Sequence, residues 1–503
     1  MKYTKIILAL FVSVLLTGCD DFLDKVNPNE KTSSSFWKTQ DDLEKGINAA
    51  YRPLRFNGCY SRWYHVLYVS RSDEGYSTSP NPDFVSYSNF QPRNNDNTEG
   101  VFFPWLDTYK GIFWANQVID NASLIENIDE DLRNRIIGEA YFLRGVHLFN
   151  VGGIWGRGAM MLSSFAEADA SIVEQDSFYE QARKDFEEAA GRLPDSYTGN
   201  NLGRATKGSA LGMLVKVLAQ QKNWNAVKTT CEEIYTLGYS LVTNYSDNFT
   251  EANENNSESL FEVQFAEGML AGIDLGSQRA KFLGVPVNGG AWDDATASNI
   301  VRTDLQKERT TDNKVDPRLK ATLAYYDSSS SGERFYGVAW DAGGLNRNKV
   351  YWKKYTYSDT HTTETLNNGI NFRVVRLADI YLLYAEALNE LGKTADAYEW
   401  INKVRRRANL PDLENSTVFT GIGNDQAKMR TQIRHERSCE LAGESWRWLD
   451  LERWGCFESP EEIAWLKSRD YEFDNFVIGK SNRYPIPYQE INNIEGLEQN
   501  PGF

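Results

Sequence analysis

The sequence predicts a mainly α-helical protein in which about four helical hairpins form a right-handed solenoid, next to a loop-rich ligand-binding face with a few short strands. Three observations predict this class. Several segments place apolar residues at helical spacing, two pairs of these segments are joined by a few polar residues, and long stretches rich in Gly, Ser, Asn and Asp separate the pairs. With 503 residues, 41% of them hydrophobic, the chain is long enough to bury a large core.

Four helices are predicted in the N-terminal half. Apolar residues between Leu43 and Leu54 fit one face of a helix that ends near Pro53. The same spacing predicts helices over Trp105–Ile119, Asn134–Gly156 and Asp176–Pro194, the last with Asp176 as its cap.

Two later stretches are predicted to be helical hairpins. Lys207–Gln220 is followed by Trp224–Gly238, and Arg376–Leu391 by Thr394–Asn409. Each pair is close to the tetratricopeptide unit of about 34 residues, although the match is loose and the pairs are not contiguous. The alternation in Glu258–Ala266 predicts one short strand between them. Residues 70–104 and 268–372 are expected to be long irregular segments, which in compact domains are usually functional.

The first 18 residues read as a secretory signal peptide. Lys2 and Lys5 precede the apolar run Ile6–Leu16, which is shorter than the roughly 20 residues that span a bilayer. Leu16-Thr17-Gly18-Cys19 resembles the lipobox of bacterial lipoproteins, in which the cysteine is lipidated and becomes the new N-terminus. An acidic pair such as Asp20-Asp21 accompanies surface export in some bacteria and inner-membrane retention in others. No later segment is apolar and long enough to span a membrane.

Charge and cysteine content exclude several functions. Removal of the leader takes away Lys2 and Lys5 and moves the net charge from -16 to -18. Such an acidic chain is not expected to bind nucleic acid or anionic lipid headgroups. The four cysteines after Cys19 form no CxxC pair, so zinc or redox chemistry is unsupported and buried free thiols are expected.

Enzymatic motifs are weak. "RHER" at Arg434–Arg437 lacks the second histidine of a metalloprotease helix, because Cys439 stands there. Asp73-Glu74 and Asp293-Asp294 are carboxylate pairs of the kind that chance supplies among 70 acidic residues, and no G-x-S-x-G occurs. An amphipathic helix is the better interpretation of this region. It would bury Ile433, Leu441 and Trp448 and pair Arg434, Arg437, Glu440 and Glu444 along its surface, with Arg447, Asp450 and Arg453 in ion pairs beneath a ligand face.

Three C-terminal stretches resemble the SusD/RagB family of nutrient-uptake lipoproteins. They are "RLADIYLLYAEALNELGKTADAYEWINKVRRRANL", "IRHERSCELAGESWRWLDLERWG" and "YPIPYQEINNIEGLEQNPGF"; "GEAYFLRGVHLFNVGGIWG" and "WLDTYKGIFWANQVID" match the family's N-terminal half. One departure is Gly443, where many relatives carry a more apolar residue, and we interpret it as local packing variation. The resemblance implies one domain over residues 19–503, with an N-terminal part of about 20–240 and a C-terminal part of about 260–503.

The same resemblance implies a function. Such proteins carry four tetratricopeptide-type hairpins, sit outside the outer membrane on a lipid anchor, and deliver glycans to a SusC-like TonB-dependent transporter. They are binding proteins, not enzymes, and in this family the acidic start accompanies surface display. Two alternatives remain open. The same architecture could capture peptides or another nutrient, or it could close the transporter without a ligand of its own.

A glycan site needs aromatic rings for sugar C–H faces and planar polar groups for hydroxyls. Two loops offer both, and the resemblance places the glycan face in the same two regions. The first offers Asp73, Tyr76, Tyr87, Phe90, Arg93 and Asn97; the second offers Asn288, Trp292, Asp293 and Asp294. Trp292 is the leading candidate, although it could instead pack its loop onto the body, and Trp340 is a third-choice platform.

Trp105, Trp224 and Trp400 are expected in the core. No cofactor or metal site is indicated: some relatives bind calcium, but no loop has EF-hand spacing.

Overall fold

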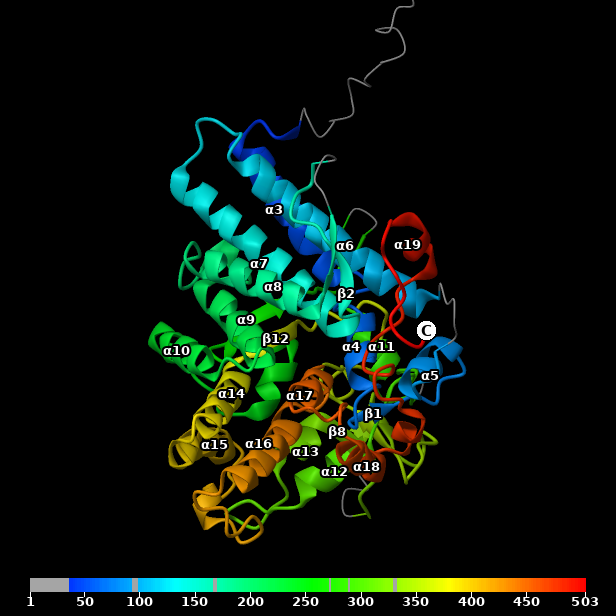
Figure 1. The fold of residues 1–503 in the computed structure, drawn as a ribbon. Coiled ribbons are helices and arrows are strands. Elements are labelled where there is room, and N and C mark those ends of the chain that lie inside the picture. Colours follow the sequence, from blue (N-terminus) through cyan, green and yellow to red (C-terminus); the bar gives the residue numbers. More distant parts are fainter. Residues whose placement is uncertain (1–35, 93–97, 166–169, 271–272, 288–289, 329–332) are drawn as a thin grey trace, which may run out of the picture.

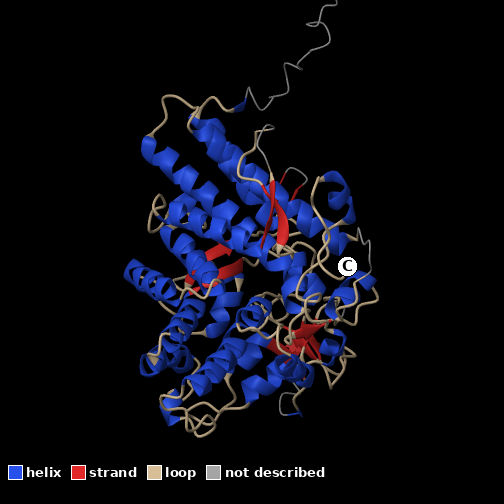
Figure 2. Ribbon diagram, in the orientation of Figure 1, coloured by secondary structure: helices blue, strands red, loops and turns tan. Residues whose placement is uncertain are grey.

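Helical hairpins form one side of the protein. The computed structural model describes residues 36–92, 98–165, 170–270, 273–287, 290–328 and 333–503. Within them, four helix pairs pack side by side down the left of Figure 1: α3 (Gln40–Tyr51) with α6 (Glu99–Ala122), α7 (Glu130–Ile154) with α8 (Gln175–Ala190), α9 (Lys207–Gln220) with α10 (Trp224–Ile234), and α14 (Leu377–Glu390) with α15 (Thr394–Arg407). The predicted mainly helical class is confirmed, and strands are few and short (Figure 2).

Local sequence explains where several of these helices begin. Thr39 and Thr206 each form a capping box with the residue three positions later, and Asp129 accepts a hydrogen bond from the backbone N–H of Leu132. The predicted cap of α8 is wrong, because the helix begins at Gln175 and Asp176 lies in its first turn. There its carboxylate favours the helix dipole instead.

The region read as one amphipathic helix after Ile433 is broken in two. α16 (Gln426–Leu441) ends before Gly443, whose φ is +74°, and α17 (Arg447–Arg453) starts after Ser445, whose φ is +69°. A Cβ on Gly443 would lie 2.7 Å from the buried ring of Trp352. The position therefore requires glycine for both backbone conformation and space.

The charges of this region pair with distant segments rather than along one helix. Arg376 donates to Glu258 at 2.8 Å, Glu440 at 2.6 Å and Glu444 at 2.8 Å, and all four side chains are buried. Lys354 adds a second cation to Glu444 at 2.8 Å. Buried carboxylates of this kind need such partners, because an unpaired charge in the interior is strongly destabilising.

The segments expected to be irregular contain a small sheet. Its strand order is β1-β7-β11-β8, all antiparallel, and it lies toward the lower right of Figure 2. The strands are β1 (Gly75–Tyr76), β7 (Thr296–Ala297), β11 (Val350–Trp352) and β8 (Leu323–Tyr325). The predicted strand near Glu258 is confirmed as β4 (Ser259–Val263), which pairs with β12 (Phe372–Arg376).

Short helices and two-stranded ribbons complete the structure. The remaining helices are α4 (Trp63–Val69), α5 (Pro82–Ser88), α11 (Arg279–Leu283), α12 (Asn299–Gln306), α13 (Pro317–Thr322), α18 (Pro460–Arg469) and α19 (Tyr488–Asn493). Two-stranded ribbons are formed by β2 (Arg157–Met160) with β3 (Ser171–Glu174), β5 (Met269–Leu270) with β6 (Ile273–Asp274), and β9 (Arg334–Phe335) with β10 (Val338–Ala339). Within the described ranges, no helix has both the length and the apolar character to cross a membrane. The thiols of Cys59, Cys231, Cys439 and Cys456 are free and buried, as expected.

Candidate functional site

Trp292 lies on the loop between α11 and β7. Its backbone N–H donates to the carbonyl of Lys281 at 2.8 Å, and its ring meets the ring of Phe282 edge-on, with centroids 4.8 Å apart. The side chain is nevertheless 49% exposed, and it is the one exposed tryptophan among the chain's 14, all of which are described. A ring fixed at one edge and open over much of its surface can act as a stacking platform.

A column of stacked rings supports this platform. Phe282 stacks on Phe84 at 5.6 Å, and Phe84 stacks on Trp63 at 5.0 Å. The guanidinium of Arg62 lies 4.8 Å from the ring centroids of both Phe282 and Trp63. Residues of α4, α5 and α11 thus form a packed support for the Trp292 ring. Because the ring is already held in place, little conformational entropy would be lost when a ligand stacks on it.

Asp293 places a polar group beside the platform. It adopts a left-handed φ of +56° and is 8% exposed, and its Oδ1 has no hydrogen-bond partner among the described residues. Burial raises the pKa of Asp293 to about 7, although Lys349, whose Nζ lies 3.9 Å from Oδ2, partly opposes the rise. Lys349 also donates to the hydroxyl of Thr78 at 3.2 Å.

Pairing of β1 with β7 brings the two predicted loops together. Gly75 lies opposite Ala297 and Tyr76 opposite Thr296 in this register. Across the same junction, Asp294 accepts hydrogen bonds from two serines: Ser77 donates to its backbone carbonyl and Ser79 to its Oδ1, both at 2.5 Å. The side chain of Asp294 therefore ties the loops to each other.

Tyr471 extends this surface and was missed from the sequence. Its ring is 63% exposed and lies 6.5 Å from the half-buried ring of Tyr76. It follows α18 in a short 3-10 turn, and the surrounding "RDYEFDN" gave no signal beyond a polar setting for one tyrosine. We call the surface formed by Tyr76, Trp292, Asp293, Lys349 and Tyr471 the Trp292 face.

Four predicted contact residues lie in the interior instead, so their predicted exposure is corrected. Asp73 has no exposed area, and Arg447 and Arg469 bind its carboxylate. Tyr87 is stacked on Tyr484 at 4.4 Å; Phe90 is packed against Trp448, Phe473 and Phe476; and Trp340 donates its Nε1–H to the carbonyl of Leu345 at 3.1 Å. All three rings are less than a tenth exposed, because α5 with the turn after it and the loop after β10 each pack their aromatic residues against neighbouring side chains.

Some predicted residues lie outside the described part of the chain. They are Arg93, Asn97 and Asn288, and also Cys19, the predicted lipidation site. Within the described part, no cluster of three or more His, Cys, Asp or Glu side chains is arranged to hold a metal ion.

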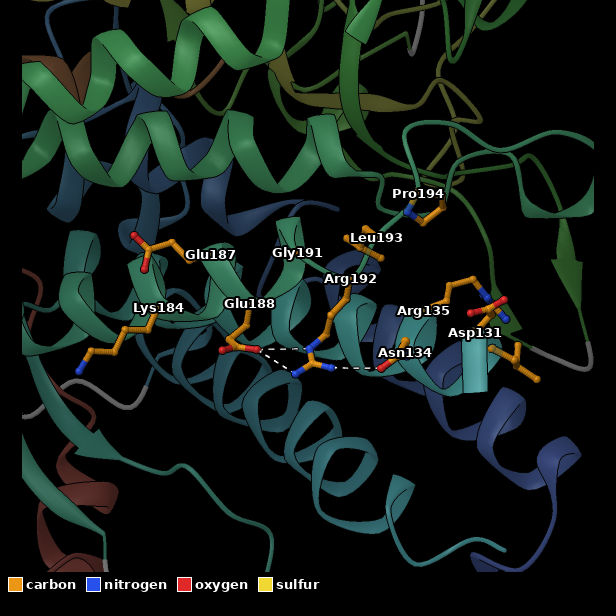
Figure 3. A pocket seen from close by; sticks show the side chains of 11 residues that line it. Asp131, Asn134, Arg135, Lys184, Glu187, Glu188, Gly191, Arg192, Leu193 and Pro194 are labelled. Carbon is orange, nitrogen blue, oxygen red and sulfur yellow. Dashed lines mark hydrogen bonds and ion pairs between the residues drawn. The ribbon is translucent and has the colours of Figure 1, made fainter. Parts of the chain in front are cut away.

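Two cavities in the described part of the chain share no lining residue with the Trp292 face. A groove of about 1110 Å³ lies between α7 and α8 (Figure 3), where the side chain of Arg192 bridges Glu188 at 3.0 Å and Asn134 at 3.2 Å. Six of its eleven lining residues are charged. A second cavity of about 670 Å³ lies near Tyr357 and His361, whose rings stack at 4.0 Å. The Trp292 face is thus built on an exposed ring and not on either of these two cavities.

Helical hairpins that support a loop-built face with an exposed tryptophan define a helical-repeat binding protein. The family model described as "SusD family" matches residues 220–503, and the model described as "Starch-binding associating with outer membrane" matches residues 21–218. The chain therefore belongs to the SusD family.

Relatives and solved structures agree with this membership. A SusD-like protein of Formosa agariphila is 26% identical over 518 residues, covering 98% of this chain and 97% of the relative. The crystal structure of a SusD superfamily protein from Bacteroides vulgatus superposes with a TM-score of 0.81 at 25% identity, covering 93% of this chain and 100% of the other. A structure described as a laminarin-binding SusD-like protein gives a TM-score of 0.74 at 26% identity, again covering 93% and 100%.

Proposed function

We propose that this protein is a surface-exposed, non-catalytic lipoprotein that binds an oligosaccharide or polysaccharide at the Trp292 face. The observation that carries the proposal is the exposed Trp292 ring, which is supported by stacked aromatics and lies beside the polar groups of Asp293 and Lys349. Sugars present C–H faces to such a ring and hydroxyls to such neighbours. Family membership and the laminarin-binding neighbour support the same ligand class.

Delivery to a SusC-like TonB-dependent transporter completes the proposal. The lipid anchor at Cys19 would hold the protein on the outer membrane, facing outward, and the transporter would receive the glycan that the Trp292 face captures. The family description that associates starch binding with the outer membrane supports this location.

Binding of the chain from Asp20 onward to a panel of polysaccharides tests the proposal. We expect one glycan class to bind, and Trp292→Ala to weaken that binding at least tenfold. Tyr488→Ala is the matched control, because Tyr488 is a similarly exposed aromatic (46%) on α19, a helix that contributes no residue to the Trp292 face. A folded wild-type protein that binds no glycan would refute independent capture and direct attention to peptides and to the transporter complex.

A further inference from the structure

A separate cavity of about 420 Å³ lies between α12, α16 and α18. Its lining is rich in cations and contains one tryptophan: Asp304, Lys307, Thr431, Arg434, His435, Ser438, Arg447, Glu461, Glu462, Trp465 and Arg469. This volume suits a ligand of one or two sugar units. Its lining residues differ entirely from those of the Trp292 face.

Arg447 contributes a buried donor with no acceptor. Its side chain is 4% exposed, and Nε and Nη2 bind the two oxygens of Asp73 at 2.7 and 2.9 Å. Nη1 has no hydrogen-bond partner among the described residues. Buried donors without acceptors are rare in native proteins because desolvating them is costly, so an acceptor entering the cavity would remove that cost.

Arg434 contributes a second and more loosely held donor. Its Nη1 lies 3.3 Å from Glu462 and its Nη2 lies 3.4 Å from the carbonyl of Trp454, both at the long end for hydrogen bonds. Its Nε has no partner among the described residues. The guanidinium also lies 5.0 Å from the ring centroid of Trp454, so turning toward an incoming anion would lengthen contacts that are already long.

The charges that line this cavity nearly balance one another, so only individual donors within it would attract an anion. Four cations line it, and three carboxylates pair with them: Asp73 with Arg447 and Arg469, Asp304 with Arg469 and Lys307, and Glu462 with Arg434. Glu461 also lines the cavity, and its carboxylate accepts a hydrogen bond from Ser459. Attraction for a ligand would thus come from the buried, unpartnered donors Arg447 Nη1 and Arg434 Nε, reached by a small turn of each guanidinium, and not from a large net charge.

Trp465 provides a wall suited to a sugar ring. It is half-buried, and the guanidinium of Arg469 lies 5.1 Å from its ring centroid. Thr431 and Ser438 also line the cavity, with hydroxyls that donate to Ala427 and Asp304. The combination of an aromatic wall and unpartnered guanidinium donors matches a sugar that carries a carboxylate.

We propose that this cavity binds an acidic sugar unit, with Arg447 and Arg434 on its carboxylate and Trp465 against its ring. The site is independent of glycan binding at the Trp292 face. Evidence against binding at one of the two sites would therefore leave the proposal for the other site standing.

Calorimetric titration of the chain from Asp20 onward tests the proposal, with glucuronate, glucose and acetate as probes at constant ionic strength. We expect glucuronate to bind, glucose and acetate to bind at least tenfold more weakly, and Arg434→Gln to lower glucuronate affinity at least tenfold. Arg192→Gln is the matched control, because Arg192 is also a partly exposed arginine paired with a glutamate, in the groove of Figure 3. Trp292→Ala should leave this affinity unchanged.

A second variant keeps the proposal testable if Arg434→Gln does not fold. Trp465→Ala removes the ring wall without removing an ion pair, and we expect it to weaken glucuronate but not acetate. The proposal is overturned if folded wild-type protein does not bind glucuronate, if Arg434→Gln binds it as tightly as wild type, or if acetate binds as tightly as glucuronate.

Discussion

Arg447 binds Asp73 through two parallel hydrogen bonds across 374 positions of sequence, with Nε–Oδ1 at 2.7 Å and Nη2–Oδ2 at 2.9 Å. The pair joins the loop after α4 to the first turn of α17. Burial alone would raise the pKa of Asp73, but Arg447 and Arg469 outweigh it and hold that pKa well below its usual range. Asp73 is thus a buried carboxylate whose ion pairs hold two segments of the fold together.

Replacing Asp73 should therefore destabilise the fold. Because Asp73→Asn leaves two buried guanidinium groups short of a partner, we expect a loss of about 3–5 kcal/mol in the free energy of unfolding. Asp412→Asn is a matched control: Arg406 binds Asp412 with the same two-bond geometry, at 2.7 and 2.8 Å, but on the surface. There the expected loss is below about 1 kcal/mol. Urea unfolding of both variants measures the difference, and equal losses would contradict the assignment.

The raised pKa of Asp293 leads us to expect that the stability of the protein depends on pH. Its folded-state pKa is raised to about 7, above the unfolded value of roughly 3.9, so its stabilising contribution is complete below about pH 4 and is lost as pH rises toward 7. Asn has no such titration and tolerates the left-handed φ. We expect Asp293→Asn to match wild type near pH 4 and to exceed it by roughly 1–3 kcal/mol at pH 8.

Unfolding of wild type and variant at a series of pH values measures this difference. Taking the difference cancels the other titrating groups, including Asp470, whose pKa burial also raises to about 7. Asp341→Asn is the control, because Asp341 is exposed and pairs with Arg347 at the surface. A stability gap that does not change with pH would disprove this role for Asp293.

Gly443 predicts a steric effect that a second glycine can isolate. Gly443→Ala should cost about 1–3 kcal/mol, because φ is +74° and the new Cβ would meet the ring of Trp352. Gly455→Ala is the control: its φ is +75°, but the nearest atom to its Cβ would be 4.0 Å away. The excess loss at Gly443, measured by thermal unfolding, reports the clash. Indistinguishable losses would assign the whole effect to the backbone.

Aromatic residues of the two loops should separate into structural and binding roles. Tyr87→Ala should lower the free energy of unfolding by roughly 3–5 kcal/mol, because Tyr87 is 2% exposed and stacked on Tyr484. Trp292→Ala should cost less than about 1 kcal/mol in stability while weakening glycan binding. Stability and binding measured on the same preparations test this separation, which a large stability loss in Trp292→Ala would contradict.

The sequence determined the helical half of the protein well. Apolar periodicity is a local signal, so the helix Lys207–Gln220 was predicted to the residue. Its partner, predicted over Trp224–Gly238, is an α-helix only to Ile234 and continues as a 3-10 turn to Leu237. The sequence also singled out Trp292, a tryptophan flanked by glycines and aspartates, whose ring is exposed in the structure; its role in binding stays a prediction. It could not separate exposed from buried aromatics in the first loop, since Tyr87 and Phe90 have equally polar neighbours in sequence.

The tertiary structure decided what those loops do. Two-residue strands such as β1 and β7 carry too little pattern to be seen locally, yet their pairing joins segments more than 200 residues apart. The partners of buried charges are equally non-local: Arg376 binds Glu440 and Glu444 across more than 60 positions. Helical periodicity depends on residues within a few turns of the chain, so it can be detected in the sequence. Burial and ion pairing depend on which distant segments come into contact, and only the folded chain brings those segments together.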